Sequence, residues 1–262
     1  MKIATWNINS IKMRLDLLRN FLTEANPDIL LLQEIKCETD KFPFDELSDL
    51  PYNFYVHGQK SYNGVAILSK FPADEIIKDF PNNYCTDQSR FLEINVSTPI
   101  GFCKIISLYA PNGSSVGSDK FETKLKFYDS FINYLSSCKS FEEKIIIGGD
   151  FNIAPFDIDV YSPQALRGTT CFTLDEQKKF RTILNSGFED LYRVTKPASH
   201  EFSWWDYRAG SFEQNKGMRI DMLLASNNAV DYLENCYMDY NLRTKLKPSD
   251  HIPVVASFHS SN

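Results

Sequence analysis

The chain has 262 residues, of which 43% are hydrophobic and 14% aromatic, so it can bury a substantial core. Its net charge of −6 argues mildly against a nucleic-acid partner, although acids gathered at a metal site lower the total while a basic patch persists elsewhere. No apolar stretch reaches the roughly 18 residues that a membrane span needs. No basic and apolar leader precedes the strand-like start, so we expect no membrane anchor and no signal peptide.

The six cysteines are scattered, and none forms a Cys-x-x-Cys pair. Such spacing does not favour a zinc site. Without an export leader, it favours reduced thiols and a cytoplasmic location.

The first part of the chain predicts one helix followed by short strands. Ser10 is placed as a helix N-cap, apolar residues recur at helical spacing from Ile11 to Leu22, and Pro27 ends the element. The strands that follow are expected at 29–33, 54–57, 64–69, 91–96 and 102–109.

The second part begins with a helix at about 118–136. One face of this helix is apolar and carries Phe121, Leu125, Tyr128, Ile132 and Leu135. A strand at 145–147 and a loop-like stretch at 154–171 follow. Thr173 and Glu176 form a capping box for a third helix, which Gly187 stops.

The pattern predicts one α/β domain over residues 1–262, because no low-complexity linker or change of composition divides the chain. The two halves are similar in outline, each with strands, an outer helix and polar strand tips. Many strands and few helices favour two packed sheets flanked by helices.

Five apolar runs end in, or start just after, an acid, an amide or a histidine. They lie at 3–9, 29–34, 145–152, 219–226 and 249–258. A core strand has no packing reason to carry a carboxylate at its end, so we expect the five tips to converge on one polar, metal-binding site that hydrolyses phosphate esters.

Glu34 is a candidate ligand for Mg²⁺ or Mn²⁺, which prefer hard oxygens and are often held by one or two carboxylates plus a substrate phosphate. The alternative is an ordinary strand-end acid facing water. Asn7 and Asn9, at the tip of the first run, are neutral ligands, groups that orient Glu34, or plain turn formers.

The GGDFN segment at 148–152 allows a tight turn and a close backbone approach. Asp150 and Asn152, at i and i+2, are expected on the same side of an extended segment. One would orient or deprotonate water and the other would donate a hydrogen bond to phosphate. The alternative is a simple Asp/Asn turn.

The SDH segment at 249–251 supplies a histidine that Asp221 could hydrogen-bond, fixing its tautomer and stabilising its cation. Neither a nucleophile elbow nor a phosphate-binding glycine loop is present. His57, His200 and His259 lack an acidic partner in a matching motif and are interpreted as surface or core residues.

The ordered set WNIN, LLLQE, SLYAPNG, GGDFN, FSWWDYR, RIDMLLAS and SDHIPV resembles the exonuclease/endonuclease/phosphatase superfamily, and more narrowly the exonuclease III type of apurinic/apyrimidinic endonuclease. The resemblance spans residues 2–258. GGDFN and SDHxPV occur across the superfamily, whereas FSWWDYR at 202–208 and KGMRID at 216–221 indicate the repair branch.

The resemblance implies a four-layer α/β sandwich of the deoxyribonuclease I type, with two mixed sheets flanked by helices. It implies a Mg²⁺ or Mn²⁺ site held chiefly by Glu34. The remaining metal-site residues that it implies are Asn7, Asp150, Asn152, Asp250 and His251.

The same resemblance implies roles in catalysis and in DNA binding. Asp150 would activate water, Asn152 would stabilise the phosphorane, His251, oriented by Asp221, would contact the phosphate, and Tyr109 would act on the leaving oxygen. The resemblance also implies that Trp204 lines the pocket for a flipped abasic sugar. From the residues alone, Tyr109 would be interpreted as a buried strand aromatic and Trp204 as a core residue. The weaker assignments to substrate binding are Lys36, Arg90 and Asn112, each otherwise a solvated surface residue.

The expected activity is hydrolysis 5′ to an abasic site in double-stranded DNA, leaving a 3′-hydroxyl, with trimming of damaged 3′ ends by a monomer. The alternatives are a superfamily phosphatase acting on inositol phosphates or phospholipid headgroups, and a catalytically silent binding relative. Three positions depart from the expected pattern. Asn9 and Met218 stand where animal-type enzymes carry Asp and Trp, and Ser89 replaces an expected Gly.

Overall fold

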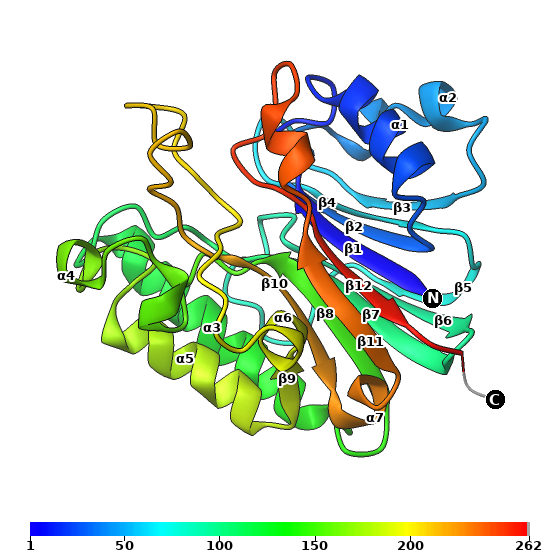
Figure 1. Ribbon diagram of the computed structural model, residues 1–262. Coiled ribbons are helices and arrows are strands. Elements are labelled where there is room, and N and C mark those ends of the chain that lie inside the picture. The colour runs from blue at the N-terminus through cyan, green and yellow to red at the C-terminus, as the bar shows by residue number, and fades with distance from the viewer. Residues whose placement is uncertain (261–262) are drawn as a thin grey trace.

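Two six-stranded sheets form the centre of the computed structural model, which describes residues 1–260 (Figure 1). The first sheet has the order β11-β12-β1-β2-β4-β3. Its strands are β1 (Lys2–Asn7), β2 (Ile29–Gln33), β3 (Asn53–His57), β4 (Val65–Ser69), β11 (Leu233–Met238) and β12 (Val254–Phe258). The last two residues of the predicted domain, 261 and 262, lie outside the described residues.

The second sheet has the order β5-β6-β7-β8-β10-β9. Its strands are β5 (Ala73–Ile77), β6 (Phe91–Thr98), β7 (Gly101–Tyr109), β8 (Lys144–Asp150), β9 (Phe188–Asp190) and β10 (Asp221–Ser226). Each sheet is mixed and contains one parallel pair, β1 with β2 and β7 with β8. This repetition agrees with the similar outline of the two halves of the sequence.

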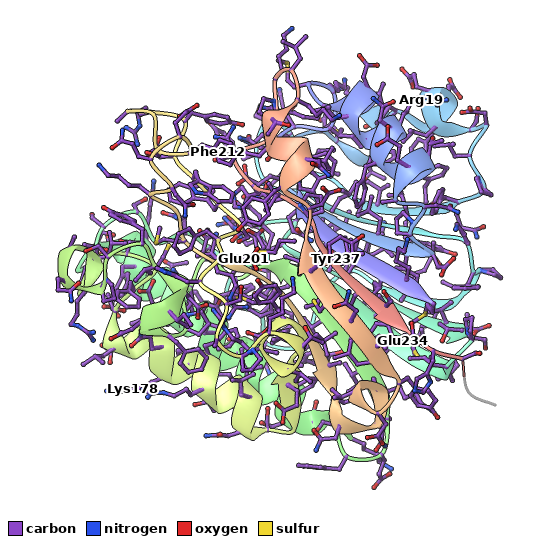
Figure 2. All side chains as sticks on the ribbon, viewed as in Figure 1. Arg19, Lys178, Glu201, Phe212, Glu234 and Tyr237 are labelled. Atoms are coloured by element: carbon purple, nitrogen blue, oxygen red, sulfur yellow. The ribbon has the colours of Figure 1, made fainter. Side chains whose placement is uncertain are left out.

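Helices cover the outer face of each sheet. The α-helices are α1 (Leu15–Glu24), α2 (Phe44–Leu47), α3 (Asp119–Ser137), α4 (Pro163–Leu166), α5 (Leu174–Asn185), α6 (Leu191–Thr195) and α7 (Asn227–Val230). The 3-10 helices are η1 (Thr39–Lys41), η2 (Asp157–Asp159) and η3 (Tyr240–Thr244). In Figure 1, α1 and α2 lie over the first sheet, and α3 and α5 lie over the second. The labelled Arg19 of α1 and Lys178 of α5 therefore point outward on opposite sides in Figure 2.

Strand alternation produces the layers, because successive side chains of a strand face opposite sides of its sheet. In β1, Ile3 belongs to the core cluster between the sheets, whereas Ala4 and Trp6 pack under α1. In β8, Ile146 faces between the sheets, and Ile147 packs with the helices of the second sheet. The predicted four-layer arrangement of two sheets and flanking helices is confirmed.

The predicted caps differ in outcome. The Ser118 hydroxyl accepts from the Phe121 N–H, and Thr173 and Glu176 form the expected capping box. Ser10, however, does not cap α1, whose N-cap is Arg14. Ser10 has φ 84° and donates its N–H to the carbonyl of Glu34, so a contact with β2's end overrides the local capping preference.

Every helix within residues 1–260 is too short or too polar to cross a membrane. All six cysteines are free thiols.

Candidate active site

Strand register brings the predicted tips to one edge of the sandwich. Parallel pairing puts the carboxyl ends of β1 and β2 side by side, with Asn7 opposite Gln33. The parallel pair in the second sheet places Tyr109 opposite Asp150. Because β10 runs antiparallel to β8, its first residue, Asp221, also lies opposite Asp150.

The tips surround a cavity of about 240 Å³ between the two sheets. Its lining comprises Glu34, Tyr109, Asn112, Asp150, Asn152, Cys171, Trp204, Met218, Ile220, Asp250 and His251. The convergence predicted from the strand tips is therefore present. The lining also includes three residues that sequence reasoning did not select for the site: Cys171, Ile220 and Met218, the last noted only as a departure from the family.

Glu34, Asp150 and His251 could hold a metal ion, because one ligand atom from each lies within 4.8 Å of the others. Asn7 joins the two acids, since its Nδ2 donates to Glu34 Oε1 (3.0 Å) and Asp150 Oδ2 (2.9 Å). Its Oδ1 accepts from the backbone N–H of Asn9. Asn7 is thus oriented to position the carboxylates, which is one of the three roles that the sequence left open.

The charges of the cluster fit a hard cation. Burial by itself raises the pKa of Glu34, but hydrogen bonding and charge from Lys36, 2.8 Å from Oε2, lower it overall. Glu34 is therefore ionised at neutral pH, which is the form that binds a cation. Glu34 also has φ 50°, an uncommon conformation for this residue type that points to a local functional constraint.

Burial raises the pKa of Asp150 to about 7, and Asp221 adds to the effect while His251 and Asn7 oppose it. For His251, burial lowers the pKa, but the carboxylates of Asp221, Asp150 and Asp250 outweigh it and raise it to about 10. The site therefore contains a carboxyl that can exchange a proton near neutrality beside an imidazolium that stays charged.

Asp221 fixes the orientation of His251. His251 Nδ1 lies 2.9 Å from Asp221 Oδ2, and Nε2 lies 3.8 Å from Asp150 Oδ2. The hydroxyl of Ser203 donates to Asp221 Oδ2 (2.6 Å), and the hydroxyl of Ser249 accepts from the His251 N–H. The sequence analysis did not select Ser203 or Ser249, although both lie inside the motifs quoted there. A motif alone does not show which of its serines hydrogen-bond a catalytic residue.

Asp150 and Asn152 form a turn rather than the extended segment expected from their spacing. Asn152 has φ 49°, and its N–H donates to Asp150 Oδ1 (2.9 Å). The expectation of alternating extended backbone is wrong here, because the strand ends at Asp150 and the side chain of that residue closes an Asx turn. Both side chains nevertheless line the cavity, and Asn112 Nδ2 donates to Asn152 Oδ1 (2.9 Å).

Tyr109 donates its hydroxyl to Glu34 Oε1 (2.8 Å). Burial, with Glu34 next in importance, raises the pKa of Tyr109 well above its usual value, so the phenol stays protonated. Arg90 lies beneath it, with its guanidinium 4.6 Å from the ring centroid and Nη1 donating to the Tyr109 carbonyl. Arg90 is 8% exposed, so its interpretation as a solvated surface residue is wrong.

Asp250 and Trp204 form the opposite wall. Trp204 Nε1 donates to Asp250 Oδ2 (3.0 Å), and Asn9 Nδ2 donates to Asp250 Oδ1 (2.8 Å). Lys36 joins the same chain of contacts, with Nζ 2.6 Å from Asn9 Oδ1. Asp250 lines the cavity, but it lies outside the Glu34, Asp150 and His251 group.

The profile of the Endonuclease/Exonuclease/phosphatase family matches residues 4–251, and the chain belongs to this family. It is 34% identical over 266 residues to an exodeoxyribonuclease III from Haemophilus influenzae, covering 98% of this chain and 100% of that protein. An exodeoxyribonuclease from Bacillus subtilis is 27% identical, with 97% and 98% covered.

Solved structures give the same result. A 3′-5′ exonuclease (NExo) from Neisseria meningitidis superposes with a TM-score of 0.94 at 34% identity, covering 98% of this chain and 99% of that one. An AP endonuclease from Archaeoglobus fulgidus gives the same four values. NExo has also been solved as a 3′ phosphatase bound to a product DNA hairpin, again with a TM-score of 0.94. The family expected from the motifs is confirmed.

Proposed function

We propose that this chain is a metal-dependent DNA repair nuclease. It hydrolyses the phosphodiester 5′ to an abasic site in duplex DNA, leaving a 3′-hydroxyl, and it also removes nucleotides and blocking phosphates from 3′ ends. The observation that carries the proposal is the Glu34, Asp150 and His251 cluster in a cavity, in a chain 34% identical to an exodeoxyribonuclease III over nearly its full length.

The partner in this proposal is double-stranded DNA with abasic sites or damaged 3′ ends, bound by a single-domain monomer. A DNA-(apurinic or apyrimidinic site) endonuclease from Dictyostelium discoideum is 27% identical to this chain, and one similar solved structure holds a DNA hairpin. Six free thiols agree with a reducing compartment, and we place the enzyme in the cytoplasm.

The cofactor would be Mg²⁺ or Mn²⁺, which Glu34 would chiefly hold together with Asp150, while Asn7 orients the two carboxylates. Carboxylate oxygens are the ligands that these cations prefer. His251 is not a strong ligand here, because a histidine with a pKa of about 10 carries a proton on the nitrogen that faces the cavity. When bound, the cation polarises the phosphate and stabilises its developing negative charge.

Asp150 orients the attacking water and accepts its proton. With a pKa of about 7, its carboxyl is largely ionised at slightly alkaline pH and is still basic enough to take a proton from water. His251 keeps its proton and donates from Nε2 to a phosphate oxygen, while Asp221 balances its charge. The Asn152 amide contacts the phosphorane. Tyr109 stays protonated and donates a hydrogen bond to the leaving 3′-oxygen.

Trp204 and Met218 form the side of the cavity that receives the flipped abasic sugar. Their backbones are bridged, and Trp204 also bridges to His251, so this wall is tied to the phosphate site. Extruding a nucleotide costs least where no base is paired, which favours abasic sites. Lys36, Arg90 and Asn112 support substrate binding from the rim and from beneath Tyr109.

An abasic-site duplex labelled at one 5′ end tests the proposal. With Mg²⁺, we expect a single nick and a product that a polymerase extends from its 3′-hydroxyl, and a chelator should abolish both. If the abasic-site duplex stays uncut in excess Mg²⁺, the assignment is refuted. Faster phosphate release from inositol polyphosphates would instead favour the phosphatase alternative, which the net charge of −6 and the shared family motifs motivate.

A further inference from the structure

Helix α3 buries a lysine directly behind the turn that carries Asn152. Lys124 is 0% exposed, because it lies three residues after Phe121 and four before Tyr128 on the buried face of α3. It pairs with Glu176 of α5, which is also fully buried, at 2.5 Å between Nζ and Oε1. Burying such a pair is costly unless every donor and acceptor is satisfied.

The remaining donors of Lys124 reach backbone carbonyls of two residues that line the catalytic cavity. Nζ lies 2.6 Å from the carbonyl oxygen of Asn152 and 3.0 Å from that of Asn112. With Glu176, these contacts occupy all three ammonium hydrogens. Because an ammonium donates strongly, the two carbonyls are held in place relative to each other.

Tyr128 extends this contact one helical turn along α3. At i+4 from Lys124, it is fully buried, and its hydroxyl donates to the carbonyl of Phe151. Consecutive carbonyls at 151 and 152 are therefore held from one face of one helix. Gly113 makes room for the lysine stem, since a Cβ there would lie 3.1 Å from Lys124 Cδ in a residue with φ +91°.

Asn152 adopts φ 49°, in the left-handed region that asparagine enters more readily than other non-glycine residues, and the contacts around the turn hold it there. Its side chain is aimed by two contacts, Nδ2 donating to the Ala110 carbonyl and Oδ1 accepting from Asn112. A shift of the backbone at Asn152 would move its Cα and would carry the side chain away from these two contacts.

We infer that Lys124 is a positioning residue, which acts from outside the cavity by fixing the backbone of Asn112 and Asn152 and hence the Asn152 amide. The expected effect on turnover rests on the proposed function. The statement that Lys124 holds the backbone of Asn112 and Asn152 does not depend on it. An apolar residue of similar length would fill the volume but would no longer hold the two carbonyls, so the backbone at Asn112 and Asn152 could shift.

The test compares Lys124→Met with the wild-type protein in the abasic-duplex assay, well below the melting temperature of both. We expect kcat to fall by about 100-fold, the size of effect that a misplaced catalytic geometry produces, while KM stays within about threefold. Hydrogen exchange of the amides at 110, 112–114 and 150–154 should quicken by about tenfold, with distant segments unchanged.

Two further variants separate positioning from stability. Lys104→Met removes a partly buried lysine that pairs with Glu93 far from the cavity, and it should lower the melting temperature without lowering kcat. Lys124→Met with Glu176→Gln removes both buried charges, so it should regain stability relative to the single variant but not regain kcat.

Unchanged kcat and unchanged local exchange in Lys124→Met would overturn the inference, as would a double variant that recovers both stability and kcat. If the wild-type protein does not cut the duplex, the proposed function fails by itself. The exchange measurement then still decides whether Lys124 holds the turn.

Discussion

Two buried networks of charged side chains in this molecule differ in the ratio of acidic to basic groups. The site holds the carboxylates of Glu34, Asp150, Asp221 and Asp250 against His251 and Lys36. Behind it, Asp159 and Asp190 face Arg193 and Arg219, two acids against two bases. For Arg219, burial lowers the pKa, but Asp159 and Asp190 outweigh it, so the guanidinium remains charged.

The difference separates a structural network from a catalytic one. Arg219 connects η2 to the end of β9, with Nε 2.6 Å from Asp159 Oδ1 and Nη2 2.7 Å from Asp190 Oδ2. Paired charges of this kind bind nothing further and fix the loop that follows β8. The site, by contrast, keeps an excess of negative charge, which a cation and a phosphate can complete.

The largest expected effect is on activity at the unbalanced network. Asp150→Asn should reduce kcat by about 10²- to 10⁴-fold, because it removes the proposed general base. The same change should not destabilise the metal-free protein. The folded pKa of Asp150 lies above its ordinary value, so its contribution to stability falls as pH rises from about 4 to about 7, and the amide avoids that loss.

Activity and thermal unfolding of Asp150→Asn, measured on one preparation at about pH 8, check both parts. A variant that is inactive only because it unfolds would contradict the comparison.

Arg219→Met should produce the opposite result in the balanced network. It leaves Asp159 and Asp190 buried with fewer partners, and breaking a buried pair in this way costs about 3–5 kcal/mol of unfolding free energy. Urea unfolding measures this loss, with Arg167→Met as a control because its pair with Asp157 is exposed. A loss in Arg219→Met no larger than that in the control would contradict the assignment of this network to structure.

Adding cation should stabilise the fold through the site. Wild-type protein in Mg²⁺ at about 100 times its dissociation constant should gain about 2.7 kcal/mol of unfolding free energy. Glu34→Gln should lose most of this gain, since it removes the main proposed ligand. Thermal unfolding with and without Mg²⁺ gives the measurement. Glu93→Gln should retain the full gain, because Glu93 is not part of the cavity lining and pairs with Lys104 instead.

The smallest expected effect is a displacement of the pH profile. In wild-type enzyme with bound cation, kcat/KM should rise as Asp150 loses its proton and fall as His251 loses its proton near pH 10. The rise should lie below about pH 7, the pKa of Asp150 without a cation, because the cation favours the carboxylate. Asp221→Asn should move the second limb to lower pH, since Asp221 is the strongest contributor to raising the pKa of His251. A second limb that stays in place would remove His251 from the mechanism.

The sequence by itself placed the polar strand ends, because a buried strand and its end are local features. Continuous apolar runs along β1, β2 and β8 put Asn7, Glu34 and Asp150 at or just beyond the ends of buried strands. The caps at Ser118 and Thr173 were likewise readable, because a cap depends on residues three apart.

The tertiary structure decided what depends on contacts distant in sequence. Ser10 does not cap α1 as predicted, because its backbone N–H donates to the carbonyl of Glu34. Arg90 is buried, because it packs beneath the ring of Tyr109. The edge strand β5 was not predicted, since its residues are largely exposed and lack a buried face. Lys124 reads as a surface lysine until α3 and α5 meet around it, 52 residues separating it from Glu176. A charge can be buried only where its partners are assembled, and no local pattern records that assembly.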